Sequence, residues 1–144
     1  MHPEIGPKGV QDFQNSLAMH AALAQNDPQK VIAAAKQIPD YIYSWFRYPR
    51  GWAHFATKDY ARAENDFRTV LLVERNLSNF NQSRRRTPLY SALAHFYLGQ
   101  IYDATGKKDQ AVNEYQEFLS HFENSKAQLP QIAVARAALQ RFMQ

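Results

Sequence analysis

The sequence predicts an all-α fold, and three observations support this prediction. Ala, Leu, Gln and Arg, which favour helices, are common, whereas Val and Ile, which favour strands, are sparse. The seven prolines and five glycines fall mostly between segments whose apolar residues have helical spacing. Two stretches also share one helix-turn-helix signature. With 144 residues and 45% hydrophobic content, the chain can bury a core, so we expect a single domain of residues 10–144 after a Pro/Gly-rich linker or tail, residues 1–9.

The first two expected helices are separated by a turn at Asn26-Asp27-Pro28. Asp27 can cap the second helix, and Pro28 suits a first helical position. Pro39 ends this second helix, because proline cannot extend a helix beyond the residue before it. The apolar residues expected to form the buried stripe of these two helices are Phe13, Leu17, Ala21, Ala24, Val31, Ile32, Ala35 and Ile38.

The third and fourth expected helices meet near Asp59. Residues 41–57 have a helical pattern rich in aromatic side chains, but Pro49 lies in the middle and predicts a kink or a short break near Tyr48. The fourth helix begins at Asp59 and ends around Asn76. A polar loop, residues 77–87, follows, because this stretch has no periodic apolar face.

Three more helices complete the expected set of about seven. The fifth begins at Thr87-Pro88, which has the form of a cap followed by a first-turn proline. A turn at residues 106–109 leads into the sixth helix, and Leu129-Pro130 introduces the last one. This last helix, about residues 129–143, would cap the open end of a stacked array.

An internal repeat relates the second half of the chain to the first. The pairs of repeated anchor residues are Gly51 and Gly99, Ala63 and Ala111, and Phe67 and Tyr115, each 48 positions apart. A repeat of this kind must stack on a neighbour to bury its apolar face, and the stacked array presents a groove to a partner. The repeat therefore predicts a binding module.

These motifs resemble the tetratricopeptide repeat, a unit of roughly 34 residues in which small residues at helix crossings let two helices approach closely. The best matching residues are Leu98, Gly99, Tyr102, Gly106, Ala111, Tyr115 and Phe118. The second unit departs from the pattern at His54 and Lys58, and the first has Met19 and Val31 at its crossing positions. The resemblance implies a short α-solenoid with units at about residues 12–43, 44–77 and 92–125.

A wider resemblance covers residues 14–143. The succession of these motifs, closed by Leu129-Pro130, is similar to the C-terminal repeat region of bacterial multidomain regulators, where repeats follow a serine/threonine kinase domain or a winged-helix DNA-binding domain. It implies a scaffolding or sensory role within a larger bacterial regulatory protein. The absence of cysteine fits the cytoplasm, and no apolar stretch is long enough to predict membrane insertion.

A concave groove that binds a protein or peptide would be lined by the inner helices. In register, its expected residues are Trp45, Tyr48, Trp52, Phe55, Phe96, Gln100 and Asp103. Core packing is the alternative explanation for most of the aromatic residues. Related domains that grip heat-shock chaperone C-termini use Lys, Asn and Arg on these helices. The residues in those positions here are Ser16, His20, Pro49, Leu93 and Tyr97, so we do not expect chaperone C-termini as ligands.

Two other functions stay open. The cluster Arg84-Arg85-Arg86 could make an accessory nucleic-acid or anion-binding loop, but no aromatic platform or recognition helix accompanies it, so nucleic acid is the weaker expectation. Self-association into a homo-oligomer is the second, because a three-unit array can leave apolar surface on its terminal helices.

The sequence does not predict an enzyme. Four histidines, His20, His54, His95 and His121, are scattered without metal-ligand spacing, so no metal site is expected. No nucleophile elbow and no glycine-rich phosphate loop is present, so we expect neither catalytic residues nor a cofactor.

Overall fold

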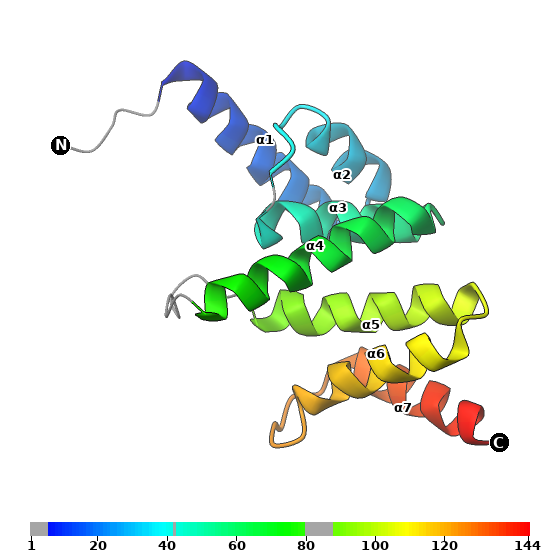
Figure 1. Ribbon diagram of the computed structural model, residues 1–144. Coiled ribbons are helices and arrows are strands. Elements are labelled where there is room, and N and C mark those ends of the chain that lie inside the picture. Colours follow the sequence, from blue (N-terminus) through cyan, green and yellow to red (C-terminus); the bar gives the residue numbers. More distant parts are fainter. Residues whose placement is uncertain (1–5, 42, 80–87) are drawn as a thin grey trace. The chain divides into compact units, whose positions relative to one another are not determined.

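A computed structural model describes residues 6–41, 43–79 and 88–144, and every regular element in these ranges is a helix. The helices are α1 (Pro7–Ala24), α2 (Pro28–Ala35), α3 (Ser44–Ala56), α4 (Tyr60–Asn79), α5 (Pro88–Ala104), α6 (Lys108–Ser120) and α7 (Pro130–Met143) (Figure 1). The prediction of an all-α chain of about seven helices is confirmed. The helices belong to two compact units, unit 1 (residues 1–69) and unit 2 (residues 70–144).

The helices differ from the sequence-based expectation at several points. Helix α2 ends at Ala35, before Pro39, and α3 begins at Ser44 instead of Tyr41. Helix α1 begins at Pro7, inside the segment expected to be a linker, because proline suits the first turn of a helix. Helix α4 continues to Asn79, past the expected end near Asn76, because neither proline nor glycine interrupts these residues. Helix α3 is continuous through Pro49, where we expected a kink or break. The buried ring of Pro49 helps to hold the helix where one backbone hydrogen bond is missing.

The same backbone turn closes α1, α3 and α5. The residue after each helix cap has a positive φ, 57° at Asn26, 63° at Lys58 and 76° at Gly106. The following amide donates to a carbonyl five residues back, in the bonds Asp27 N to Ala22 O (2.9 Å), Asp59 N to His54 O (2.8 Å) and Lys107 N to Tyr102 O (2.8 Å). This pattern is the Schellman motif. Residues 7–35, whose sequence departs most from the repeat pattern, therefore share the backbone turn of the other two helix pairs.

Unit 1 is held by a core between α1, α2 and α3. The buried residues of this core are Met19, Ala22, Val31, Ala35, Ile38, Phe46 and Ala53. The expected buried stripe of the second helix is correct at Val31 and Ala35, and at Ile38 just after α2 ends, whereas Ile32 is half-buried.

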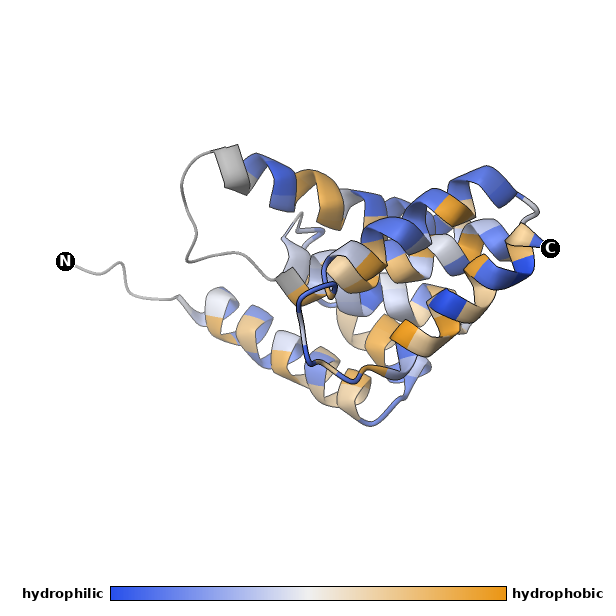
Figure 2. Ribbon diagram, turned by 90° about the horizontal axis from the view of Figure 1, so that it is seen from below, coloured by the Kyte–Doolittle hydropathy of each residue, from blue (hydrophilic) through white to orange (hydrophobic). Residues whose placement is uncertain are grey.

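The expected stripe of α1 is wrong. The Phe13 and Leu17 side chains are 63% and 55% exposed, and Ala21 and Ala24 are exposed as well. Helices α2 and α3 pack on the side of α1 that carries Met19 and Ala22, which is roughly opposite. Figure 2 shows hydrophobic and hydrophilic segments alternating along α1.

Each unit contains one close helix crossing at a glycine. A Cβ built on Gly51 would lie 3.2 Å from the Phe67 ring, and one built on Gly99 would lie 2.8 Å from the Tyr115 ring. The two crossings correspond in the 48-residue register, so the expected role of both glycines is confirmed. In unit 2, α6 also packs against α7, which buries Ala135.

Candidate partner-binding site

One polar pair joins the two helices of each repeat, buried in unit 1 and half-buried in unit 2. In unit 1, Arg47 Nη1 on α3 donates to Asp66 Oδ1 on α4 over 2.9 Å. In unit 2, His95 Nδ1 on α5 lies 2.6 Å from Glu114 Oε2 on α6. Both members of the second pair stand 48 positions after those of the first, so the pair belongs to the repeat itself. The crossing glycines and this polar pair together fix the position of one helix on the next.

Unit 1 extends its pair into a cluster of four charges. Arg50, one turn along α3, donates from Nε and Nη2 to both oxygens of Asp66, over 2.9 Å and 2.6 Å. Its third nitrogen, Nη1, donates to Asp40 over 2.8 Å, and Arg47 Nη2 lies 3.2 Å from the same carboxylate. The guanidinium of Arg50 also stands over the Phe46 ring, 4.8 Å from the ring centre. Arg50 is thus held on several sides, with its head group preorganised.

The two carboxylates of this cluster differ in exposure. The Asp66 side chain is 2% exposed and accepts three hydrogen bonds from arginines. The Asp40 side chain, on the connection between α2 and α3, is 66% exposed. Asp66 is therefore a fixed part of the scaffold, whereas water can solvate Asp40 without its arginine partners.

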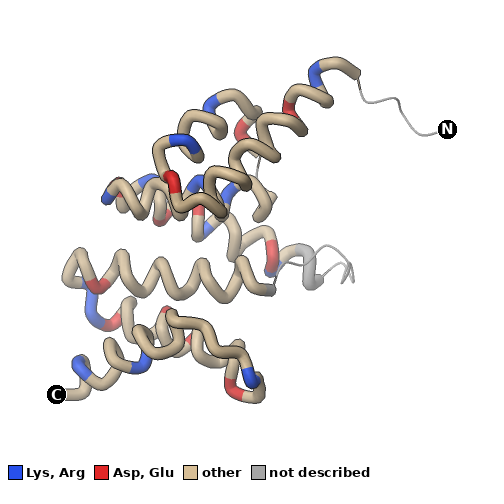
Figure 3. The backbone as a smooth tube through the Cα atoms, turned by 180° about the vertical axis from the view of Figure 1, so that it is seen from behind, with Lys and Arg blue, Asp and Glu red and all other residues tan. Residues whose placement is uncertain are grey.

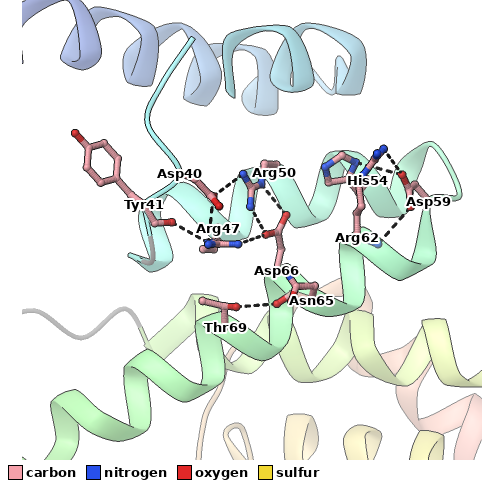
Figure 4. Close-up of polar contacts among 10 residues, drawn as sticks. All are labelled: Asp40, Tyr41, Arg47, Arg50, His54, Asp59, Arg62, Asn65, Asp66 and Thr69. Carbon is pink, nitrogen blue, oxygen red and sulfur yellow. Dashed lines mark hydrogen bonds and ion pairs between the residues drawn. The ribbon is translucent and has the colours of Figure 1, made fainter. Parts of the chain in front are cut away.

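A hollow of about 870 Å³ opens beside this cluster, within unit 1. Its walls come from α2, α3, the start of α4 and Asp40 (Figure 4). The residues that line it are Gln29, Ile32, Ala35, Lys36, Asp40, Arg47, Arg50, His54, Thr57, Asp59, Ala61, Arg62, Asn65 and Asp66. Most of these side chains are polar, and apolar walls come from Ile32 and the alanines.

The far end of the hollow carries a second, looser set of charges. Arg62 Nη1 lies 2.9 Å from Asp59 Oδ2, and His54 Nδ1 lies 4.0 Å from the same oxygen. Burial lowers the pKa of His54, although the carboxylates of Asp66 and Asp59 act in the opposite direction. His54 is therefore mainly neutral at pH 7, and can donate or accept a hydrogen bond here.

The structure places the predicted aromatic residues of α3 on the other side of that helix. At about 3.6 residues per turn, Trp45, Tyr48, Trp52 and Phe55 lie roughly opposite the stripe that faces the hollow. Trp45 is 37% exposed, and Trp52 and Phe55 are half-buried. Tyr48 is buried, with its ring centre 6.1 Å from that of Phe67. Tyr48 therefore serves packing, as the alternative explanation proposed, while the other three keep accessible surface.

The predicted residues of unit 2 are divided in the same way. Phe96 is buried, with its ring centre 5.2 Å from that of Phe118, whereas Gln100 and Asp103 are half-buried. Asp103 accepts a hydrogen bond from Arg141 of α7. The cluster at residues 84–86 lies outside the described residues. For that reason the structure does not place Arg84, Arg85 or Arg86.

The comparison with protein families adds one match, to the tetratricopeptide repeat, over residues 92–125. These residues comprise most of α5 and all of α6, the pair that crosses at Gly99. Residues 92–125 are a tetratricopeptide repeat. No curated protein and no solved structure gave a significant match. Tetratricopeptide repeats are helical repeats of protein–protein interaction modules.

The repeat carries no metal site among the residues that the structure describes. His95 and His121 have ring centres 5.9 Å apart, and burial together with the charge of His95 lowers the pKa of His121.

Within the described ranges of the chain, no helix is long and apolar enough to cross a membrane. Figure 3 shows basic and acidic positions interspersed among the residues that the structure describes.

Sequence reasoning missed the charged side of α3. Arg47, Arg50 and His54 follow one another at intervals of three and four residues, which places them on one face of a helix. This signal was available, but it was hidden by the denser aromatic stripe in the same segment. The contribution of Asp40 was not predictable from spacing, because it comes from a non-helical connection.

Proposed function

We propose that the chain is a protein-interaction module that holds an extended peptide segment of a partner protein in the hollow of unit 1. The observation that carries the proposal is the hollow itself, about 870 Å³ and lined by side chains from three helices. A pocket of this size is typical of sites that enclose a ligand. Polar groups such as Gln29, Thr57 and Asn65 can pair with the peptide backbone.

The length of the hollow sets the size of the segment. Its lining on α3 extends from Arg47 to Thr57, which corresponds to about 15 Å at a rise of 1.5 Å per residue. An extended chain covers about 3.3–3.6 Å per residue, so four or five residues of a partner fit along it.

A pair of tryptophan substitutions tests this proposal. Ala61 is exposed and lines the hollow, so Ala61→Trp should fill the hollow without disturbing the core. Ala33 is also exposed but is not part of the lining, so Ala33→Trp is the matched control. The wild-type chain and both variants are used as baits in the native host lysate, at low and at moderate salt.

We expect a partner protein that is captured by the wild type and by Ala33→Trp and is lost with Ala61→Trp. Equal capture by all three baits would contradict binding in the hollow. Circular dichroism of the purified variants confirms that both remain folded.

The opposite side of α3 is a second candidate surface of the same module. Trp45 and Tyr43 are exposed there, and Trp45 lies 5.8 Å from the ring centre of Tyr41. Trp45→Ala removes a partly exposed ring on this side of α3 and does not touch the lining of the hollow, so it distinguishes this surface from the hollow. Phe96→Ala is unsuitable for the purpose, because Phe96 is buried and its loss would destabilise unit 2.

Self-association through α1 is a candidate function of another kind. Val10, Phe13 and Leu17 are all exposed, and their spacing of three and four residues matches the apolar seam of paired helices. A second copy of the chain could cover this stripe with its own α1. Phe13→Glu should then abolish any concentration-dependent increase in mass, measured by sedimentation velocity.

The larger setting of the module is part of the same proposal. We infer a scaffolding role within a bacterial regulatory protein, from the wider sequence resemblance over residues 14–143. Nucleic-acid binding through residues 84–86 is the competing function. It would be lost on replacing the three arginines by alanine, and it would weaken steeply with added salt.

A further inference from the structure

We infer that the hollow recognises a carboxylate side chain of the bound peptide, and that Asp40 occupies the position of this carboxylate when no peptide is bound. The inference rests on the proposed function and specifies its ligand as a segment that contains Asp or Glu. It begins from the charge count at the end of the hollow that Arg47 and Arg50 line.

Arg47 and Arg50 bring two positive charges to this end, and the buried carboxylate of Asp66 compensates one of them. Asp40 compensates the other, through Nη1 of Arg50 and Nη2 of Arg47. Lys36 lines the same hollow and adds a further positive charge. Without Asp40, this end of the hollow would therefore attract an anion.

Arg50 is built to receive such an anion. Asp66 holds its Nε and Nη2 atoms, and the Phe46 ring supports the face of the guanidinium. Only Nη1 is directed to the replaceable partner, Asp40, over 2.8 Å. A guanidinium that is already fixed loses little conformational entropy when it binds a carboxylate.

Asp40 can leave at low cost, and Asp66 cannot. The Asp40 side chain is 66% exposed, so it regains hydration when it is displaced, whereas Asp66 is 2% exposed and holds both arginines. An incoming carboxylate that replaces Asp40 leaves the charge balance of the cluster unchanged. The exchange therefore needs no rearrangement of α3 or α4.

Two immobilised libraries of random heptapeptides, amidated at their C-termini, test the inference. The central residue is Glu in one library and Gln in the other, and the most strongly retained peptide of each is then measured by fluorescence anisotropy. Amidation removes the free terminal carboxylate, so that only side chains can supply the anion. The proteins are the wild type, Asp40→Asn, Arg50→Gln and Arg62→Gln. Arg62→Gln removes the same charge from the other end of the hollow.

We expect the best peptide of the Glu library to bind the wild type more tightly than the best peptide of the Gln library. Asp40→Asn removes the competing carboxylate and should tighten binding of the Glu peptide about two- to fivefold, the range typical of an exposed ion pair. Binding of the Gln peptide should not change. Arg50→Gln should abolish the preference for Glu, and Arg62→Gln should retain it.

Asp40 is exposed, so its substitution leaves the fold intact even if Arg50→Gln proves unstable. Weaker or unchanged binding of the Glu peptide to Asp40→Asn would overturn the inference, as would an equal loss with Arg50→Gln and Arg62→Gln. If Gln peptides bind as well as Glu peptides and are lost with Ala61→Trp, the hollow binds peptides without a carboxylate preference. If neither library yields a peptide that is sensitive to Ala61→Trp, the proposed function fails as well.

Discussion

Replacement of Gly99 by alanine should destabilise the protein through a single contact. A Cβ at this position would lie 2.8 Å from Cδ1, 2.9 Å from Cε1 and 3.1 Å from Cγ of Tyr115. Carbon atoms normally approach to about 3.5–4.0 Å, so α5 and α6 must separate or the ring must move. Tyr115 is 1% exposed, so its ring cannot turn outward into solvent without breaking contacts in the core.

The expected magnitude combines two opposing effects. Overpacking of a core costs about 1–3 kcal/mol, whereas alanine is favoured over glycine in a helix by about 0.8–1.0 kcal/mol. The 2.8 Å contact places the overpacking cost in the upper half of its range, about 2–3 kcal/mol. The net loss should therefore be about 1–2 kcal/mol, or roughly 3–7 °C in Tm for a chain of this size. Urea unfolding followed by circular dichroism at 222 nm measures it.

Two further variants test whether the contact with Tyr115 is the cause. Gly51→Ala should cost less, because its nearest contacts are 3.0 Å to Asp66 Cβ and 3.2 Å to the Phe67 ring. Tyr115→Leu combined with Gly99→Ala should show a favourable coupling energy, because the smaller side chain makes room for the methyl group. A Gly99→Ala protein as stable as the wild type would refute the reasoning.

Four other predictions follow from the turns, the buried pair and the titratable groups. Lys58→Gly should raise the free energy of unfolding by about 0.5–1 kcal/mol in urea, because Lys58 has a φ of 63° that glycine adopts without strain. Asp66→Asn should cost about 3–5 kcal/mol in the same assay, because it removes the buried carboxylate that pairs with both Arg47 and Arg50. Burial raises the pKa of Tyr115 to about 12, so stability should fall as pH rises between about 10 and 12, and Tyr115→Phe should lose this dependence in alkaline urea titrations. Burial lowers the pKa of His54, so its contribution to stability is present above pH 6.5 and lost as pH falls through the lowered pKa, and His54→Gln should reduce the acid sensitivity of Tm.

The sequence predicts the fold well because each repeat is specified by local signals. Turn residues such as Asn26 and Gly106 stop one helix, and the crossing residues Gly51 and Gly99 mark where the next one packs. The turn signals depend only on neighbouring residues in the chain, and the crossing glycines are found from the 48-residue repeat. The failure on α1 has a different origin. Both sides of that helix carry apolar residues, and only the packing of α2 and α3 decides that Met19 is buried and Phe13 is not.

The candidate site was less predictable, because it depends on which side of α3 remains open. The aromatic side of α3 carries the stronger apolar pattern, so the sequence predicts the groove there. The hollow instead lies on the side of Arg50 and His54. The connection between α2 and α3 then adds Asp40. No helical period encodes the position of a residue in a connection, so the competing carboxylate could be found only in three dimensions.

The proposed recognition of a carboxylate is specific to unit 1, because the equivalent positions of unit 2 carry other residues. The inter-helix pair is common to both units, as Arg47 with Asp66 and as His95 with Glu114. Two residues of α3 that line the hollow in unit 1 are replaced by core residues in unit 2. Arg50 and His54 correspond in the 48-residue register to Leu98 and Tyr102, and both of these are buried. In unit 2 the same helical positions belong to the core, and an arginine in the place of Leu98 would lack both space and hydration there. The shared pair maintains the geometry of the repeat, and the residues around it decide whether a unit packs or binds.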